Sequence, residues 1–188
     1  MIDIFRIQPF CTDPNQFGRV LNDHCAASPY EWIQLMDQDA MLLDHIEANK
    51  VMEQAIIKYP DTDIFGAYTN RCGYLWQMTD DWEESNHEML DTDRIEFLNV
   101  LAARTRIMNG PSCKHIPSVA GFFMLFKKSY WEKNRFQDKV IEGKKTFDKM
   151  FCSNANIMRL IKGVYVYHRY RQGKDISDDS HLRQGSLF

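Results

Sequence analysis

The order of apolar and polar positions predicts strands and helices that alternate along the chain. Residues 2–10 alternate between the two kinds of side chain and end near a proline, as a strand does. Asp13 and Pro14 then suit a helix N-cap and the first helical position. Further strands are predicted over residues 32–36, 63–69, 118–128 and 163–171, and further helices over residues 42–60, 91–111 and 129–134.

This alternation determines the predicted fold class. Strands that alternate with helices build an α/β fold, here a Rossmann-like, mostly parallel sheet with helices on both faces. A chain of 188 residues suits one buried core better than two. We expect one compact domain over residues 1–171 and a polar, flexible tail over residues 172–188.

Composition narrows the classes of partner and the compartment. The net charge is −3, and mixed charges along the chain give no indication of a nucleic-acid partner. The five cysteines are widely spaced and form no zinc-binding pattern, so we expect reduced thiols and a cytoplasmic location. No apolar run approaches the roughly 20 residues that span a bilayer.

Three Asp-x-Asp triplets are the first candidates for chemistry. Those at residues 61–63 and 91–93 are explained by a turn after a proline and by the start of a helix. Asp37 and Asp39 instead follow the apolar strand at residues 32–36 and precede further apolar residues. On an extended backbone their carboxylates project to the same side, an arrangement that suits Mg²⁺ or Mn²⁺. From the spacing alone, a metal site and a solvated loop both remain open.

The segments around this triplet carry a wider pattern. Residues 18–42 place a helix with Gly18 and an asparagine before a strand that ends in D-x-D. Residues 118–133 hold a small-Gly-aromatic-Met run followed by basic residues and a tryptophan. Residues 147–151 hold a Phe-Asp turn, and residues 161–171 a strand with an aromatic-His pair. In this order the segments resemble family 2 glycosyltransferases of the GT-A fold, in a shortened form.

The resemblance implies a role for five residues. Asp37 and Asp39 match the acids that hold the metal and the diphosphate of the donor, and His168 matches a residue that completes the metal site. Asn22 matches a helix asparagine beside the donor, and Asp148 matches the acidic residue that acts as the base and deprotonates the acceptor hydroxyl. Strand alternation also puts His168 where a buried core histidine would lie, so that interpretation stays open.

The last predicted strand and one other strand end supply further candidates. Arg169 and Arg171 are candidates for contacts to the donor diphosphate. Tyr165 and Tyr167 share a side of that strand with Arg169, where they either stack on a ligand or pack in the core. Residues 69–71 follow another predicted strand and are expected to line the same cleft.

The function implied by the resemblance is inverting, metal-dependent transfer of a sugar from a nucleotide-sugar donor to a hydroxyl acceptor. The expected acceptor is a polysaccharide or a lipid-linked glycan, and peripheral membrane association stays open. Two features of the family have no match in this sequence. One is an acidic strand end before the D-x-D, and the other is a Glu-Asp pair at the position of the catalytic base. They motivate an alternative, a non-catalytic GT-A-like module that binds a glycan or a protein. A nucleotidyl or phosphoryl transferase is disfavoured because no phosphate-binding glycine loop is present.

Overall fold

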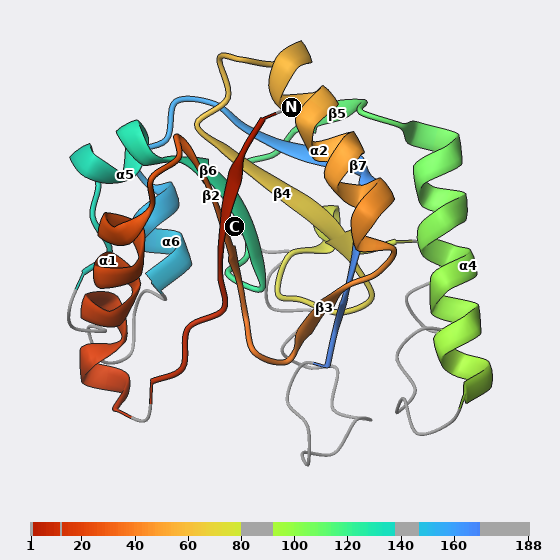
Figure 1. The fold of residues 1–188 in the computed structure, drawn as a ribbon, viewed down its shortest axis with the longest axis horizontal. Helices are drawn as coiled ribbons and strands as arrows, with labels where there is room; N and C mark the ends of the chain where they lie inside the picture. Colours follow the sequence, from red (N-terminus) through yellow and green to blue (C-terminus); the bar gives the residue numbers. More distant parts are fainter. Residues whose placement is uncertain (1, 12, 80–91, 138–146, 170–188) are drawn as a thin grey trace. The chain divides into compact units, whose positions relative to one another are not determined.

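A computed structural model describes residues 2–11, 13–79, 92–137 and 147–169 (Figure 1). In this part of the chain, seven strands form one sheet in the order β1-β2-β6-β4-β7-β3, and β5 pairs with β7 off this path. The strands are β1 (Ile4–Ile7), β2 (Trp32–Met36), β3 (Ala40–Leu42), β4 (Ile64–Thr69), β5 (Cys113–His115), β6 (Phe123–Lys127) and β7 (Met158–His168).

The strand directions confirm the predicted α/β sheet. β1 and β2 are parallel, and β6 is antiparallel to its neighbours β2 and β4. β4 and β7 run in the same direction: Asp63 donates its N–H to the Ile157 carbonyl at their starts, and the Asn70 side chain bonds the backbone of His168 at their ends. Four strands, β1, β2, β4 and β7, therefore share one direction, and β3 runs antiparallel to β7.

The helices agree with the apolar pattern in position. They are α1 (Phe17–Ala27), α2 (His45–Lys58), α4 (Thr92–Asn109), α5 (Lys128–Lys133) and α6 (Phe147–Cys152), with 3₁₀ turns η1 (Pro14–Gln16) and η2 (Leu75–Gln77). The sequence did not predict α6, β3 or β5, each of which has six residues or fewer. No helix among the described residues is long and apolar enough to cross a membrane.

The predicted N-cap at Asp13 belongs to η1 and not to α1. The Asp13 carboxylate accepts hydrogen bonds from the Asn15 N–H at 2.9 Å and from the Gln16 side chain at 3.1 Å. These bonds lower the pKa of Asp13 below its usual value. The first turn closes as a 3₁₀ turn, in which Gln16 donates its N–H to the Asp13 carbonyl, and the α-helix starts one turn later.

The chain divides into two compact units, and the first comprises residues 1–38, 61–66 and 115–159. It contains β1, β2 and β6 side by side, together with α1, α5 and α6 (Figure 1). The first four of the five residues of β2 are buried, so the apolar run at residues 32–36 forms an interior strand. Phe136 stacks on Phe151 with 4.1 Å between ring centroids, which anchors α6.

The second unit comprises residues 39–60, 67–114 and 160–188. Its described part contains α2, α4, β3 and most of β7. Among the described residues of this unit, one core cluster is formed by Leu43, Leu98, Leu101, Ala102, Tyr165 and Tyr167. The predicted domain boundary at residue 171 and the predicted tail at residues 172–188 lie outside the described residues.

Candidate metal centre

Asp37 directly follows β2, and its backbone is held on two sides. Its N–H donates to the Phe122 carbonyl at 3.1 Å, and its carbonyl accepts a hydrogen bond from the Gln8 side chain at 2.8 Å. Gln8 follows β1 and Phe122 precedes β6, which are the two neighbours of β2 in the sheet. The position of Asp37 is thus fixed by the strand order, and its side chain is half-buried.

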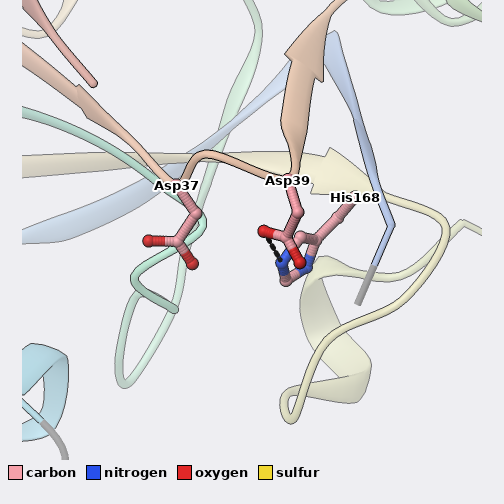
Figure 2. A group of neighbouring side chains, drawn as sticks. All are labelled: Asp37, Asp39 and His168. Atoms are coloured by element: carbon pink, nitrogen blue, oxygen red, sulfur yellow. Dashed lines mark ion pairs between the residues drawn. The ribbon is translucent and has the colours of Figure 1, made fainter. Parts of the chain in front are cut away.

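Asp39 lies beside His168 because of the register between β3 and β7. Ala40 is opposite His168 in this antiparallel pair, and Arg169 donates its N–H to the Asp39 carbonyl at 2.8 Å. An Asp39 carboxylate oxygen lies 3.2 Å from Nε2 of His168 (Figure 2). The His168 side chain is 5% exposed and that of Asp39 is 42% exposed. Solvent therefore reaches the pair from the side of Asp39.

The two ring nitrogens of His168 have different partners. Nδ1 lies 2.9 Å from the carbonyl oxygen of Arg71. Because a carbonyl only accepts hydrogen bonds, Nδ1 carries the proton, and Nε2 is the nitrogen that faces Asp39. The hydrogen bond from His168 is the main cause of a lowered pKa at Asp39. Either an imidazolium Nε2–H or a cation in its place satisfies this carboxylate.

Asp37, Asp39 and His168 together form a group that fits a divalent cation. Each offers one ligand atom, and these atoms all lie within 4.8 Å of one another. Figure 2 shows the three side chains, with Asp37 directly after β2, Asp39 directly before β3 and His168 at the end of β7. Two carboxylate oxygens and one imidazole nitrogen suit Mn²⁺, and Mg²⁺ through its preference for oxygen. A ligating histidine usually donates its other N–H to a carbonyl, as His168 does to Arg71.

Asn22 uses its carboxamide within the protein. Its Nδ2 donates to the Phe136 carbonyl at 2.8 Å, and its Oδ1 accepts from the Trp131 indole and from the Phe136 N–H, both at 3.0 Å. These bonds tie α1 to α5 and to the segment that follows α5. A role of Asn22 beside a donor stays a prediction, and one of its N–H groups at most remains for that role.

Asp148 lies in the first turn of α6. One carboxylate oxygen accepts the Gly121 N–H at 3.0 Å, and the other accepts the Lys149 N–H at 2.9 Å. The bond from Gly121 connects the start of α6 to the segment that leads into β6. The catalytic role of Asp148 stays a prediction.

The remaining candidates near the end of β7 differ in their surroundings. Arg169 follows β7, and its guanidinium makes no hydrogen bond or ion pair with the residues that the structure describes. Arg171 lies outside the described residues. Tyr165 and Tyr167 are buried in the core cluster of their unit, which favours packing over contact with a ligand. The side chain of Arg169 therefore remains a candidate for contact with an anion.

Comparison with known proteins finds solved structures of low similarity and no family. No family model matches the chain, and no curated protein matches it. A solved structure of TarS residues 1–349 from S. aureus has a TM-score of 0.46 and 12% identity over 80% of this chain. This chain spans 39% of that one. A structure of A197 from STIV has a TM-score of 0.45 and 12% identity, covering 89% of this chain and 85% of that one. At these values neither structure carries an argument about activity.

Sequence reasoning missed how the centre is held together. β3 has only three residues, yet its pairing with β7 brings Asp39 to His168. The residues after β4 were expected to line a cleft, but Asn70 and Arg71 are buried and bond His168. The available signal was a run of polar residues directly after an apolar strand. Such a run marks an end of the sheet, but it does not show which residues the polar side chains contact.

Proposed function

We propose that this chain is a metal-dependent glycosyltransferase that moves a sugar from a nucleotide-sugar donor to a hydroxyl acceptor on a polysaccharide or a lipid-linked glycan. The observation that supports it most directly is the group of Asp37, Asp39 and His168, with the Nδ1–H of the histidine bonded to a backbone carbonyl. The order of sequence segments that resembles family 2 glycosyltransferases is the second support.

The residues present fit Mn²⁺ or Mg²⁺. Asp37 and Asp39 would supply carboxylate oxygens and His168 the Nε2 nitrogen, which favours Mn²⁺ because imidazole binds transition metals better than it binds Mg²⁺. When bound, such a cation neutralises charge on the departing diphosphate. Asp39 is 42% exposed, so a charged ligand can approach it from solvent.

The chain's own residues would share the remaining work. Arg169 and Arg171 would donate hydrogen bonds to diphosphate oxygens. Asp148 would accept the proton of the acceptor hydroxyl, whose oxygen then bonds to the anomeric carbon as the bond from that carbon to the diphosphate breaks. Attack from the face opposite the leaving group inverts the anomeric configuration.

A thermal-shift screen of nucleoside diphosphates with and without Mn²⁺ tests this proposal. A ligand that binds only the folded chain raises its Tm, and we expect a rise of several degrees for one diphosphate only when Mn²⁺ is present. Asp37→Ala and Asp39→Ala should abolish that rise. Asp23→Ala is the matched control because Asp23 is an exposed acid whose pairing with Arg19 is loose, at 4.0 Å. If no nucleoside diphosphate raises the Tm with Mn²⁺, the proposal is wrong.

A non-catalytic module is the second candidate, and one observation favours it. Both carboxylate oxygens of Asp148 accept backbone hydrogen bonds, as a purely structural acid at a helix start does. Donor hydrolysis or transfer should fall at least 100-fold in Asp148→Asn if this residue is the base. Equal turnover in wild type and Asp148→Asn would remove Asp148 from the mechanism. Glycan binding without nucleotide binding would support the non-catalytic module.

A further inference from the structure

The side chain of Asn70 extends the pairing of β4 and β7 beyond the last residue of β4. Its Nδ2 donates to the His168 carbonyl at 3.1 Å, and its Oδ1 accepts the His168 N–H at 2.8 Å. A carboxamide thus forms the two hydrogen bonds that a neighbouring strand would otherwise provide. Both backbone groups of His168 are satisfied by one side chain.

The orientation of this carboxamide is fixed by its partners. The backbone N–H of His168 only donates and its carbonyl only accepts, so the two ends of the Asn70 amide cannot exchange. The Thr69 hydroxyl adds a third contact, donating to Oδ1 at 3.2 Å. Asn70 is 2% exposed, and loss of its side chain would leave two buried backbone groups of His168 without these partners.

The same segment also fixes the imidazole ring. Arg71, the residue after Asn70, places its carbonyl oxygen 2.9 Å from Nδ1 of His168. Because Asn70 ties this segment to the backbone of His168, the carbonyl and the ring keep a constant separation. On the other side of β7, Ala40 pairs with His168 and brings Asp39 to Nε2. His168 is therefore held between two segments that each contact one ring nitrogen.

We propose that Asn70 is a positioning residue for His168, holding the ring so that Nδ1–H meets the Arg71 carbonyl and Nε2 faces Asp39. Its use in metal binding rests on the proposed function, whereas the ring geometry can be tested without metal. A carbonyl acceptor on one ring nitrogen fixes the tautomer and raises the basicity of the other nitrogen toward a metal. Asn70 has this effect on the metal without contacting it.

Nitrogen NMR of the imidazole tests the ring geometry in the metal-free chain. His168 signals are assigned by their loss in His168→Gln, and the wild type should show a protonated Nδ1 with slow proton exchange at pH 8. Asn70→Ala should loosen the hydrogen bond from Nδ1–H to the Arg71 carbonyl and speed exchange of that proton at least 10-fold. Asn70→Asp, of the same shape, keeps the acceptor for the His168 N–H and loses the donor, so a smaller change is expected.

Gln77→Ala is the matched control for these variants. Gln77 is a fully buried amide that donates to a backbone carbonyl of β4, that of Ala67, at 3.2 Å. Its loss should lower stability and leave the His168 signals unchanged. If Asn70→Ala and Asn70→Asp also leave the His168 signals as in the wild type, the positioning role is overturned.

The affinity for Mn²⁺ separates this inference from the proposed function. Removal of a group that orients a ligating histidine typically weakens metal binding 10- to 100-fold. We expect a loss of that size in Asn70→Ala and none in Gln77→Ala. A wild type that binds no Mn²⁺ would contradict the proposed function, while the NMR result would still decide the role of Asn70. Wild-type affinity in Asn70→Ala would overturn the positioning role at the metal.

Discussion

At the scale of single residues, a buried arginine near the start of β7 forms several hydrogen bonds with side chains, as His168 does with its own neighbours. Arg159 has a side chain 9% exposed, and its guanidinium bonds both carboxylate oxygens of Asp61, at 2.8 and 2.9 Å. The Thr62 hydroxyl accepts another of its hydrogen bonds. One acid of a D-x-D triplet that sequence reasoning assigned to a turn is thus the partner of a buried cation.

This pair predicts an acid-sensitive contribution to stability. The hydrogen bonds from Arg159 lower the pKa of Asp61 below 3.8, its value without them. A carboxyl with a lowered folded-state pKa stabilises the fold above pH 3.8, and this stabilisation is lost as the pH falls through the folded-state pKa. Asp61→Asn should therefore lower the Tm at pH 7, and its difference from wild type should shrink below pH 3.8.

Calorimetry of both proteins between pH 7 and about pH 2.5 checks this expectation. Asp23→Asn, at an exposed acid, serves as the control and should leave the Tm nearly unchanged across the range. A difference between wild type and Asp61→Asn that is as large at the acidic end as at pH 7 would contradict the assignment.

The cysteines give a second prediction at this scale. Burial raises the pKa of Cys25 to about 12 and that of Cys152 to about 11. Since the thiolate is the reactive form, neither should react with a disulfide reagent at pH 8 in the folded chain. Cys11 and Cys113 are partly exposed and should react first. Mass spectrometry after brief labelling reads the order, and modification of Cys25 before Cys11 would contradict it.

At the scale of elements, the prediction from sequence worked where an element carries its own period. β2 and β4 are apolar runs that end in polar residues, and α1 and α2 repeat apolar positions with helical spacing. β3 was not predicted because three residues are too few to show a period, and its position depends on pairing with β7. The missed element is the one that joins Asp39 to His168.

The turn between α4 and β5 packs tightly against β7, and this contact predicts the effect of a small substitution. A Cβ at Gly163 would lie 2.1 Å from the Gly110 carbonyl oxygen, and Gly110 itself has a φ of +50°. Gly163→Ala should lower the free energy of unfolding by about 1–3 kcal/mol, since the backbone on both sides must shift. Gly73→Ala is the control because nothing lies within 4 Å of its added Cβ.

Urea denaturation of the two variants checks this contact. We expect a clear fall in the midpoint for Gly163→Ala and little change for Gly73→Ala. Equal midpoints for Gly163→Ala and wild type would show that β7 does not require this close approach.

At the scale of the whole molecule, the alternation of strands and helices was enough to predict an α/β sheet. It was not enough to predict that β6 lies antiparallel between β2 and β4, because an apolar run reads the same in either direction. Asp37 and Asp39 were predicted from their spacing after an apolar strand and from a resemblance between segments, and His168 from that resemblance alone. The residues that hold these ligands in place came only from the fold. Asn70 is the clearest case, since its hydrogen bonds join positions 98 residues apart in the chain.

The central claim is that Asp37, Asp39 and His168 hold one divalent cation. Titration of the chain with Mn²⁺, followed by the electron paramagnetic resonance signal of the free ion, tests it most directly. The wild type should bind one Mn²⁺ per chain, and Asp37→Ala, Asp39→Ala and His168→Ala should each lose that site while Asp23→Ala retains it. A wild type that leaves the free-ion signal undiminished, or an Asp39→Ala variant that binds Mn²⁺ as the wild type does, would contradict the account.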